Sequence, residues 1–271
     1  MSEGSLEMRK KCRCLDHHTA WWIVCCAVLL PLQVYGQGSA GTKGKAEPRF
    51  IVDMPTAGML DKGSFAVDID FYQEGGVMAG LSAGIFERLS FGISYGGSRL
   101  LGSGKATMNP APGVNVRIRL LEEHMSLPAL AIGFDSQGKD GYIKELERYT
   151  VKSPGIFAVV SKNYLLAGYL SLHGGINYTF ERSDDSKGYN VYAGAEKTIG
   201  PFLSLLAEYN LALNDNSGSA IGKGRGYLNV ALRWSFAGGV TLGVNLKDAL
   251  RNSRNASMVN RTARIEVVSG F

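Results

Sequence analysis

The chain has 271 residues, including 35 glycines and 4 cysteines, with 45% hydrophobic residues, 20% charged residues and a formal net charge of +5. The length suits one large domain or two small ones, and the absence of a Gly-X-Y period excludes collagen. No stretch of about 18 residues is uniformly apolar, which excludes a helical multi-pass membrane protein. The mild, dispersed charge argues against nucleic-acid binding, so a glycine-rich and mainly β domain remains.

Residues 1–36 have the pattern of a secretory signal peptide. A basic stretch at residues 9–13 precedes an apolar run at 21–32, and small or β-branched residues then suit cleavage before Gln37. The apolar run, about 12 residues, is too short for a membrane-spanning anchor. Val24 before Cys25 does not suit lipoprotein processing. Met1 and Met8 both remain candidate start sites.

All four cysteines lie in this first segment, at Cys12, Cys14, Cys25 and Cys26. The mature chain is therefore expected to contain no disulfide and no thiol chemistry, as an exported protein stabilised by other means. We expect three parts: the signal peptide at 1–36, a periplasmic N-terminal segment at 37–62 and a barrel domain at 63–271.

From Ser64 onward, apolar residues alternate with small or polar ones at a period of two. The pattern predicts twelve strands of about 8–11 residues, the length that crosses a bilayer at a tilt. The expected strands start near residues 64, 76, 89, 113, 127, 155, 167, 189, 202, 225, 240 and 261.

The connections between these strands fall into two classes. Those after every even-numbered strand are tight, whereas those after odd-numbered strands are mostly long and polar, except the first. This segregation is typical of outer-membrane barrels, and a soluble β-sandwich has no reason to adopt it. We therefore predict an all-β, closed, antiparallel up-and-down transmembrane β-barrel of about twelve strands, in the bacterial outer membrane with both termini periplasmic.

The last strand ends on an aromatic residue, Phe271, after an amphipathic stretch. This resembles the signal that the barrel-assembly machinery recognises. Because open strand edges in hydrocarbon would leave N–H and C=O groups unpaired, the first strand should pair with the last. Inner-face glycines such as Gly84 and Gly194 would allow tight curvature and close approach of lumen side chains.

Charged and polar residues on the predicted inner face are the candidate lumen-lining groups. Two interpretations are open: ion pairs that fix strand register, or a narrow charge-lined pore for polar solutes. The loop at 135–154 is long enough to fold inward as a constriction or to remain external. The candidates are Asp68, Asp70, Arg117, Arg119, His173, Glu208, Arg233, Arg264 and Glu266.

Catalytic chemistry has little support in the sequence. Ser171, His173 and Asn177 share one strand face. Outer-membrane phospholipases use the same three residue types on the lipid-facing side, whereas here alternation is expected to turn them towards the lumen. No His, Asp and Glu residues have zinc-ligand spacing. We expect no enzyme activity, no cofactor and no metal.

Three segments resemble bacterial outer-membrane proteins of the YjbH-like family: residues 51–63, 132–138 and 159–164. The resemblance extends over roughly residues 50–271, and its motifs are short and not catalytic. It implies an outer-membrane barrel linked to exopolysaccharide production or export. The chain is shorter than typical full-length members, so any extra domain that they carry is expected to be absent.

The leading functional hypothesis is a narrow channel or an accessory component of envelope exopolysaccharide export. The alternative is a structural or adhesive barrel acting through its extracellular loops, and the third hypothesis is a membrane-embedded lipid hydrolase. The expected partners are outer-membrane lipid, the barrel-assembly machinery and polysaccharide or small polar solutes, without nucleic acid.

Overall fold

The computed structural model describes residues 47–236, 239–254 and 259–270, and nearly all of its regular structure is β. Two short 3-10 helices, η1 (Gln73–Gly75) and η2 (Lys144–Leu146), lie in connections. Within these ranges, no helix is long and apolar enough to cross a membrane. The strands are β1 (Ser64–Tyr72), β2 (Gly76–Phe86), β3 (Leu89–Ser98), β4 (Thr107–Met108), β5 (Gly113–Leu121), β6 (Ala129–Asp135), β7 (Lys139–Ile143), β8 (Arg148–Val151), β9 (Gly155–Leu165), β10 (Tyr169–Tyr178), β11 (Asn190–Thr198), β12 (Leu203–Asn210), β13 (Tyr227–Ser235), β14 (Val240–Lys247) and β15 (Asn260–Gly270).

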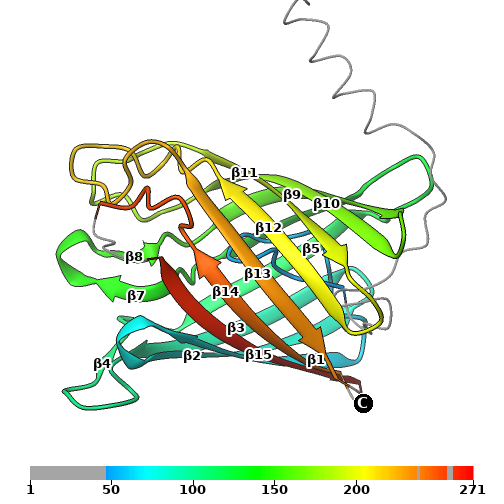
Figure 1. The fold of residues 1–271 in the computed structure, drawn as a ribbon, viewed down its shortest axis with the longest axis horizontal. Coiled ribbons are helices and arrows are strands. Elements are labelled where there is room, and N and C mark those ends of the chain that lie inside the picture. The colour runs from blue at the N-terminus through cyan, green and yellow to red at the C-terminus, as the bar shows by residue number, and fades with distance from the viewer. Residues whose placement is uncertain (1–46, 237–238, 255–258, 271) are drawn as a thin grey trace, which may run out of the picture. The chain divides into compact units, whose positions relative to one another are not determined.

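Twelve of these strands form a closed antiparallel ring (Figure 1). Each pairs with its neighbours along the chain, and β1 also pairs with β15, which closes the barrel. The short β4 adds to β3, and β7 and β8 form a separate hairpin. The predicted fold is confirmed, and every predicted strand start lies within two residues of the observed one.

The connections divide as expected between the two ends of the ring. At one end, called here the turn end, lie the tight connections and the ends of β1 and β15 at Ser64 and Gly270. At the other, called the loop end, lie η1 and the longer connections 99–112, 136–154, 179–189, 211–226 and 248–259.

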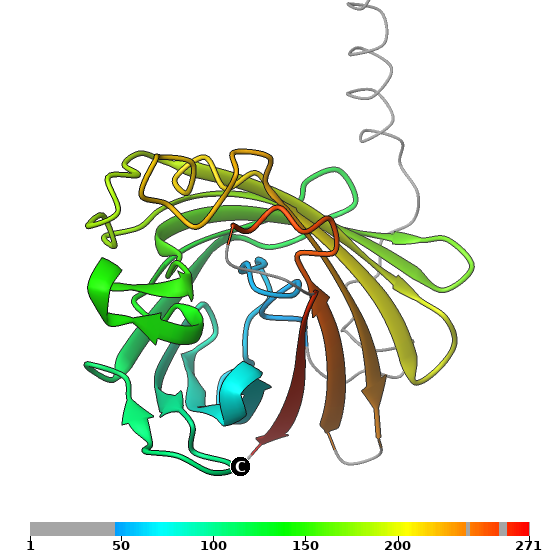
Figure 2. The same cartoon turned by 60° about the vertical axis from the view of Figure 1, so that its left-hand side comes forward.

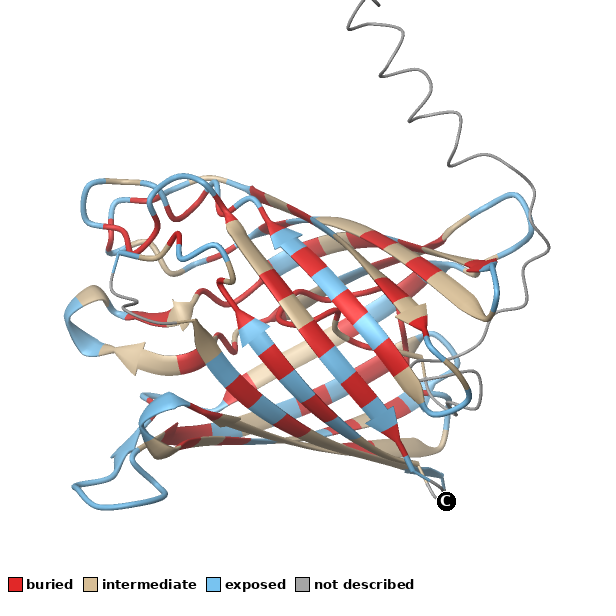
Figure 3. Cartoon of the chain, viewed as in Figure 1, coloured by how far each residue is buried: buried red, intermediate tan, exposed pale blue. Residues whose placement is uncertain are grey.

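Burial alternates along most strands of the ring (Figure 3), and the exposed positions are mainly apolar whereas the buried ones are mainly polar. On β12 and β13, Leu205 and Leu232 remain 50% and 43% exposed on the outside. Ser204, Glu208 and Arg233, on the other face of the same strands, are buried. An exposed apolar belt around a closed sheet is the arrangement that hydrocarbon requires, because every strand edge is paired.

The described part of the predicted periplasmic segment 37–62 lies within the barrel. Residues 49–60 enter the ring of strands as an irregular hairpin, called here the lumen hairpin, and all of them except the half-buried Phe50 are buried (Figure 2). The amide of Thr56 donates to the carbonyl of Arg49 across its two arms, and Phe50 and Pro55 form a β-bridge. The hairpin lies inside because several of its side chains are apolar. The barrel interior covers these side chains, whereas in the periplasm they would be exposed to water.

Arginine introduced at Leu232 is expected to destabilise the barrel in lipid vesicles by about 2–4 kcal/mol, because the position faces the middle of the apolar belt. Denaturant unfolding of Leu232→Arg against the parent measures this. The matched control is Leu101→Arg, on an exposed loop residue, which should change stability by less than about 0.5 kcal/mol. Equal stability of the two variants would contradict a lipid-facing Leu232.

Candidate functional site

The carboxylate of Glu208 binds the tip of the lumen hairpin. Its Oε2 accepts hydrogen bonds from three successive backbone amides, those of Val52, Asp53 and Met54, each at 2.9 Å. Its Oε1 accepts a hydrogen bond from Asn229 at 2.8 Å. Glu208 is fully buried on the inner face of β12, so these charge-assisted bonds replace the water that the carboxylate loses.

Two arginines of the barrel wall bind the carbonyl groups of the same hairpin. Arg117 donates to the carbonyls of Arg49 and Gly58, at 3.0 and 2.7 Å. Arg233, across the lumen, donates to the carbonyls of residues 50–51. These contacts join wall side chains to hairpin backbone, and they satisfy peptide groups that have no strand to pair with.

Ion pairs fix the first arm of the hairpin and the residues that lead into it. Arg49 lies 2.7 Å from Asp68 on β1 and 2.8 Å from Glu266 on β15. Glu47 pairs with Arg119 on β5. The hairpin therefore joins the first strand, the last strand and the far wall of the barrel.

The ring of Phe50 lies among three cations. The guanidinium carbons of Arg117 and Arg264 are 5.4 and 5.3 Å from its centroid, and the Lys139 ammonium is 4.6 Å away. Cation–π attraction at buried sites contributes about 2 kcal/mol or more. The hairpin thus places an aromatic ring among cations of the wall and of the connection 136–154.

Apolar contacts complete the seat of the hairpin. Ile51 and Met54 pack into a buried cluster with Phe157 and Tyr192. Gly194 makes room for this packing, because a Cβ there would lie 2.9 Å from a methyl carbon of Ile51. This agrees with the expected role of inner-face glycines in close approach.

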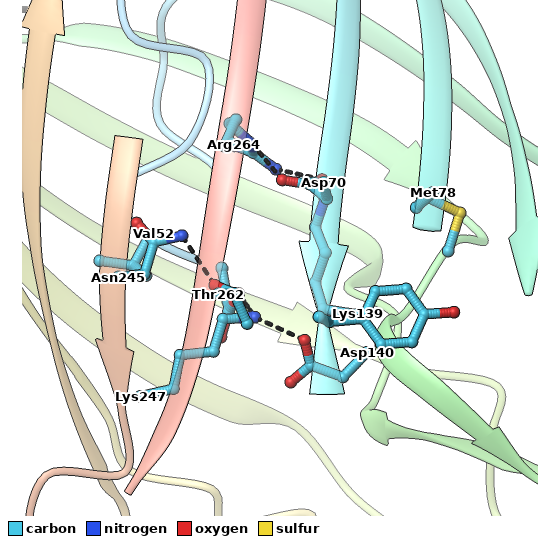
Figure 4. A pocket seen from close by; sticks show the side chains of 11 residues that line it. Val52, Asp70, Met78, Lys139, Asp140, Asn245, Lys247, Thr262 and Arg264 are labelled. Atoms are coloured by element: carbon cyan, nitrogen blue, oxygen red, sulfur yellow. Dashed lines mark hydrogen bonds and ion pairs between the residues drawn. The ribbon is translucent and has the colours of Figure 1, made fainter. Parts of the chain in front are cut away.

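The connection 136–154 folds inward over the loop end, which decides between its two predicted arrangements. Asp140, at the start of β7, lies 2.9 Å from Lys247 on β14 (Figure 4). Lys247 also lies 2.7 Å from Asp53 of the lumen hairpin. Lys139 is 3.6 Å from Asp70. The inward loop and the lumen hairpin therefore meet through shared charges.

A buried charge network, called here the loop lock, holds three loop-end connections together. Arg148 of β8 pairs with Asp184 at 2.5 Å and with Asp215. Lys152 pairs with Asp184 at 2.7 Å and donates to the carbonyl of Asn214 at 2.8 Å. Because all four charged groups are buried, removing one leaves its partners uncompensated.

Small cavities remain between the lumen hairpin and the wall. One of about 10 Å³ lies beside Asp53 and Lys247, and another of about 30 Å³ lies beside Phe50 and Asp68. Each has room for about one or two water molecules. In the described part of the chain, the hairpin and the inward loop occupy the lumen between these cavities.

All nine predicted lumen-lining residues lie on the inner face, and most of them bind the lumen hairpin. The predicted neighbourhood of the first and last strands is observed, with Asp70 and Arg264 paired at 2.5 Å. The carboxylate partner of Arg233 is Glu196, at 3.5 Å. Phe271, the predicted assembly signal, lies outside the described residues.

Several residues that build the site were not predicted. Arg49 and Asp53 are on the hairpin itself, and Tyr192 and Lys247 reach it from the wall. One signal was available in the sequence: residues 50–60 are mostly apolar although they precede the first strand, and such a segment is expected to be covered by other parts of the protein.

The predicted Ser, His and Asn trio does not form a hydrogen-bonded relay. Ser171 donates to Asn163, and His173 pairs through Nδ1 with Ser161, at 2.8 Å. The Ser161 hydroxyl in turn accepts the amide of Ala57 in the lumen hairpin. These polar groups bind the neighbouring strand and the hairpin.

A family described as "Exopolysaccharide biosynthesis protein YbjH" matches residues 50–143, which confirms the resemblance over that range. No curated protein matches the chain.

Solved structures with a similar fold include the KdgM porin, at 12% identity and a TM-score of 0.45, covering 77% of this chain and 99% of that one. The NanC porin is 9% identical with a TM-score of 0.45, covering 76% and 99%. Omp33 of Acinetobacter baumannii is 10% identical with a TM-score of 0.42, covering 77% and 97%. The strand pairing of this chain defines its barrel independently of these likenesses.

Replacing Glu208 with Leu is expected to loosen the hairpin tip, because three amides lose their only charged acceptor. Hydrogen exchange of residues 52–54 should quicken by at least tenfold. Glu208→Gln keeps an acceptor oxygen and should stay closer to the parent. Unchanged exchange in Glu208→Leu would show that the carboxylate does not hold the tip.

Acid is expected to open the loop lock. Burial alone would raise the pKa of Asp184, but hydrogen bonds from Lys152 and Arg148 lower it below its ordinary value of 3.8. A carboxyl group with a depressed pKa stabilises the fold above its unfolded pKa, and that contribution disappears as the pH falls through the folded pKa.

At a pH lower than about 4, the hydrogen-exchange protection factors of the amides at 179–189 should therefore be smaller than at pH 7. The Asp184→Asn variant should lack this dependence. Asp185→Asn, which alters the exposed neighbour, should retain it. A pH response that survives Asp184→Asn would assign the effect to another group.

Proposed function

We propose that this chain is an outer-membrane channel closed by its own lumen hairpin, and that it serves an envelope exopolysaccharide system. The apolar belt and closed ring support the membrane location. The separation of tight turns from long loops supports periplasmic termini and extracellular loops. The match to the exopolysaccharide family over residues 50–143 supports the biological role.

The observation that carries the proposal is the chemistry of the lumen wall. The interiors of transmembrane barrels are polar, and this wall presents Arg117, Glu208 and Arg233 to the hairpin backbone. Hydrogen bonds to charged groups contribute a net of about 1.5–3 kcal/mol each, because water replaces them when they break. A polar wall therefore allows the hairpin to leave and water and polar solutes to take its place.

A second candidate is a structural or adhesive barrel that acts through its loops. The loop lock favours it, because buried ion pairs among Arg148, Lys152, Asp184 and Asp215 give the loop end a fixed surface. Ion conductance distinguishes the two candidates, because a channel conducts ions when it opens and a structural or adhesive barrel need not.

The double variant Arg49→Ala/Asp53→Ala removes the hairpin's own ion pairs and leaves the wall intact. In planar bilayers we expect the parent to be mostly silent and the variant to open at least tenfold more often, since about 1.4 kcal/mol shifts a closed–open equilibrium tenfold. Glu87→Ala/Arg88→Ala, which removes one acid and one base from an exposed turn, is the matched control.

Heat-modifiable migration on detergent gels shows that each variant is folded before it is tested. Folded double variants that stay silent would refute the gated channel and favour the loop-surface candidate. A parent that conducts steadily would refute closure by the hairpin. In cells, loss of the chain should lower secreted exopolysaccharide, and an unchanged amount would separate the barrel from that system.

A further inference from the structure

Four exposed cations gather on two joined connections at the loop end. They are Lys223 and Arg225 on 211–226, and Arg251 and Arg254 on 248–254, called here the basic patch. The two connections are tied by backbone hydrogen bonds from the amide of Lys223 to the carbonyl of Asn252, at 3.0 Å, and from the amide of Arg254 to residue 221, at 2.7 Å. Lys223 also donates through Nζ to the carbonyl of Arg251, at 2.9 Å.

The acids of the same connections are turned away from this surface. Asp215 is buried in the loop lock with Arg148. Asp248 is buried and accepts the amides of residues 252–253. On residues 211–226 and 248–254, the described acidic side chains are therefore all buried, while the four cations are exposed. On the adjoining loop, the exposed Asp185 is offset by the exposed Lys187.

The basic patch lies at the edge of the apolar belt. Tyr209, on the outer face of β12, donates its hydroxyl to the carbonyl of Arg225 at 2.6 Å. The outer row of β12 continues past the strand end through Leu211 and Leu213, which are 38% and 40% exposed. Leu250, beside Arg251, is 55% exposed. Cations and exposed leucines thus occupy the same two connections.

We propose that this surface binds a phosphorylated lipid headgroup of the leaflet at the loop end, with Lys223, Arg225, Arg251 and Arg254 facing the phosphates and the leucines contacting the acyl chains. Arginine and lysine bind phosphate through charge-assisted hydrogen bonds, and basic groups attract anionic headgroups at a membrane surface. A soluble acidic polysaccharide would use the cations and leave the leucines without a partner. The proposal rests on the proposed membrane location and does not depend on conductance.

Binding of bis-phosphorylated lipid A to the full chain in neutral detergent, followed by native mass spectrometry, tests this. The parent should bind it more tightly than dephosphorylated lipid A. Each cation removed should weaken binding about fivefold, so the double variant Arg225→Ala/Arg251→Ala should weaken it about 25-fold. Arg99→Ala/Lys105→Ala, which removes two exposed cations from another loop-end connection, should bind like the parent.

Equal affinity for the phosphorylated and dephosphorylated lipids would overturn the proposal. So would equal losses in the patch variant and its control, because the effect would then follow net charge alone. Binding of polygalacturonate with no binding of lipid A would reassign the surface to soluble polysaccharide. If the folded Arg49→Ala/Asp53→Ala variant stays silent in bilayers while the parent binds lipid A specifically, the channel is rejected and the lipid site is retained.

Discussion

The contact on which the rest of the structure depends is that between Glu208 and the three amides at the hairpin tip. An unpaired carboxylate at this depth would be costly, and so would three unpaired amides. The carboxylate accepts the hydrogen bonds that the three amides donate, so neither is left unpaired. Other contacts act in the same way: Arg117 and Arg233 donate hydrogen bonds to hairpin carbonyls, and Arg49 of the hairpin pairs with Asp68 of the wall. A polar lumen and an unpaired peptide segment thus stabilise each other.

Closure of the barrel has two layers. The hairpin enters from the turn end, and the connection 136–154 covers the loop end, where Lys247 contacts both through Asp53 and Asp140. Their shared lysine couples the layers, because displacing either one leaves it with a single carboxylate. The loop lock holds the outer layer independently of the hairpin. Opening a continuous path through the lumen therefore requires movement of both layers.

The sequence predicted the barrel well because alternation is a local property. Each strand records which of its faces meets lipid, and the lengths of the connections separate the two ends. The inner-face charges were also found this way, including Asp70 and Arg264, whose pairing follows from closure. The lumen hairpin was missed because residues 49–60 have no period, and their partners are far away in sequence. A carboxylate such as Glu208 does not reveal from one strand whether it binds a cation, water or a backbone.

Thiol labelling at the hairpin tip tests the closed lumen most directly. With the four native cysteines replaced by serine, Met54→Cys places one thiol at a position that is 2% exposed, and Gly218→Cys places one on an exposed connection. In the folded barrel in lipid, a membrane-impermeant maleimide should label position 218 at once and position 54 at least a hundredfold more slowly. Both should react fully after unfolding. Equally rapid labelling of position 54 in the folded barrel would contradict a lumen filled by the hairpin.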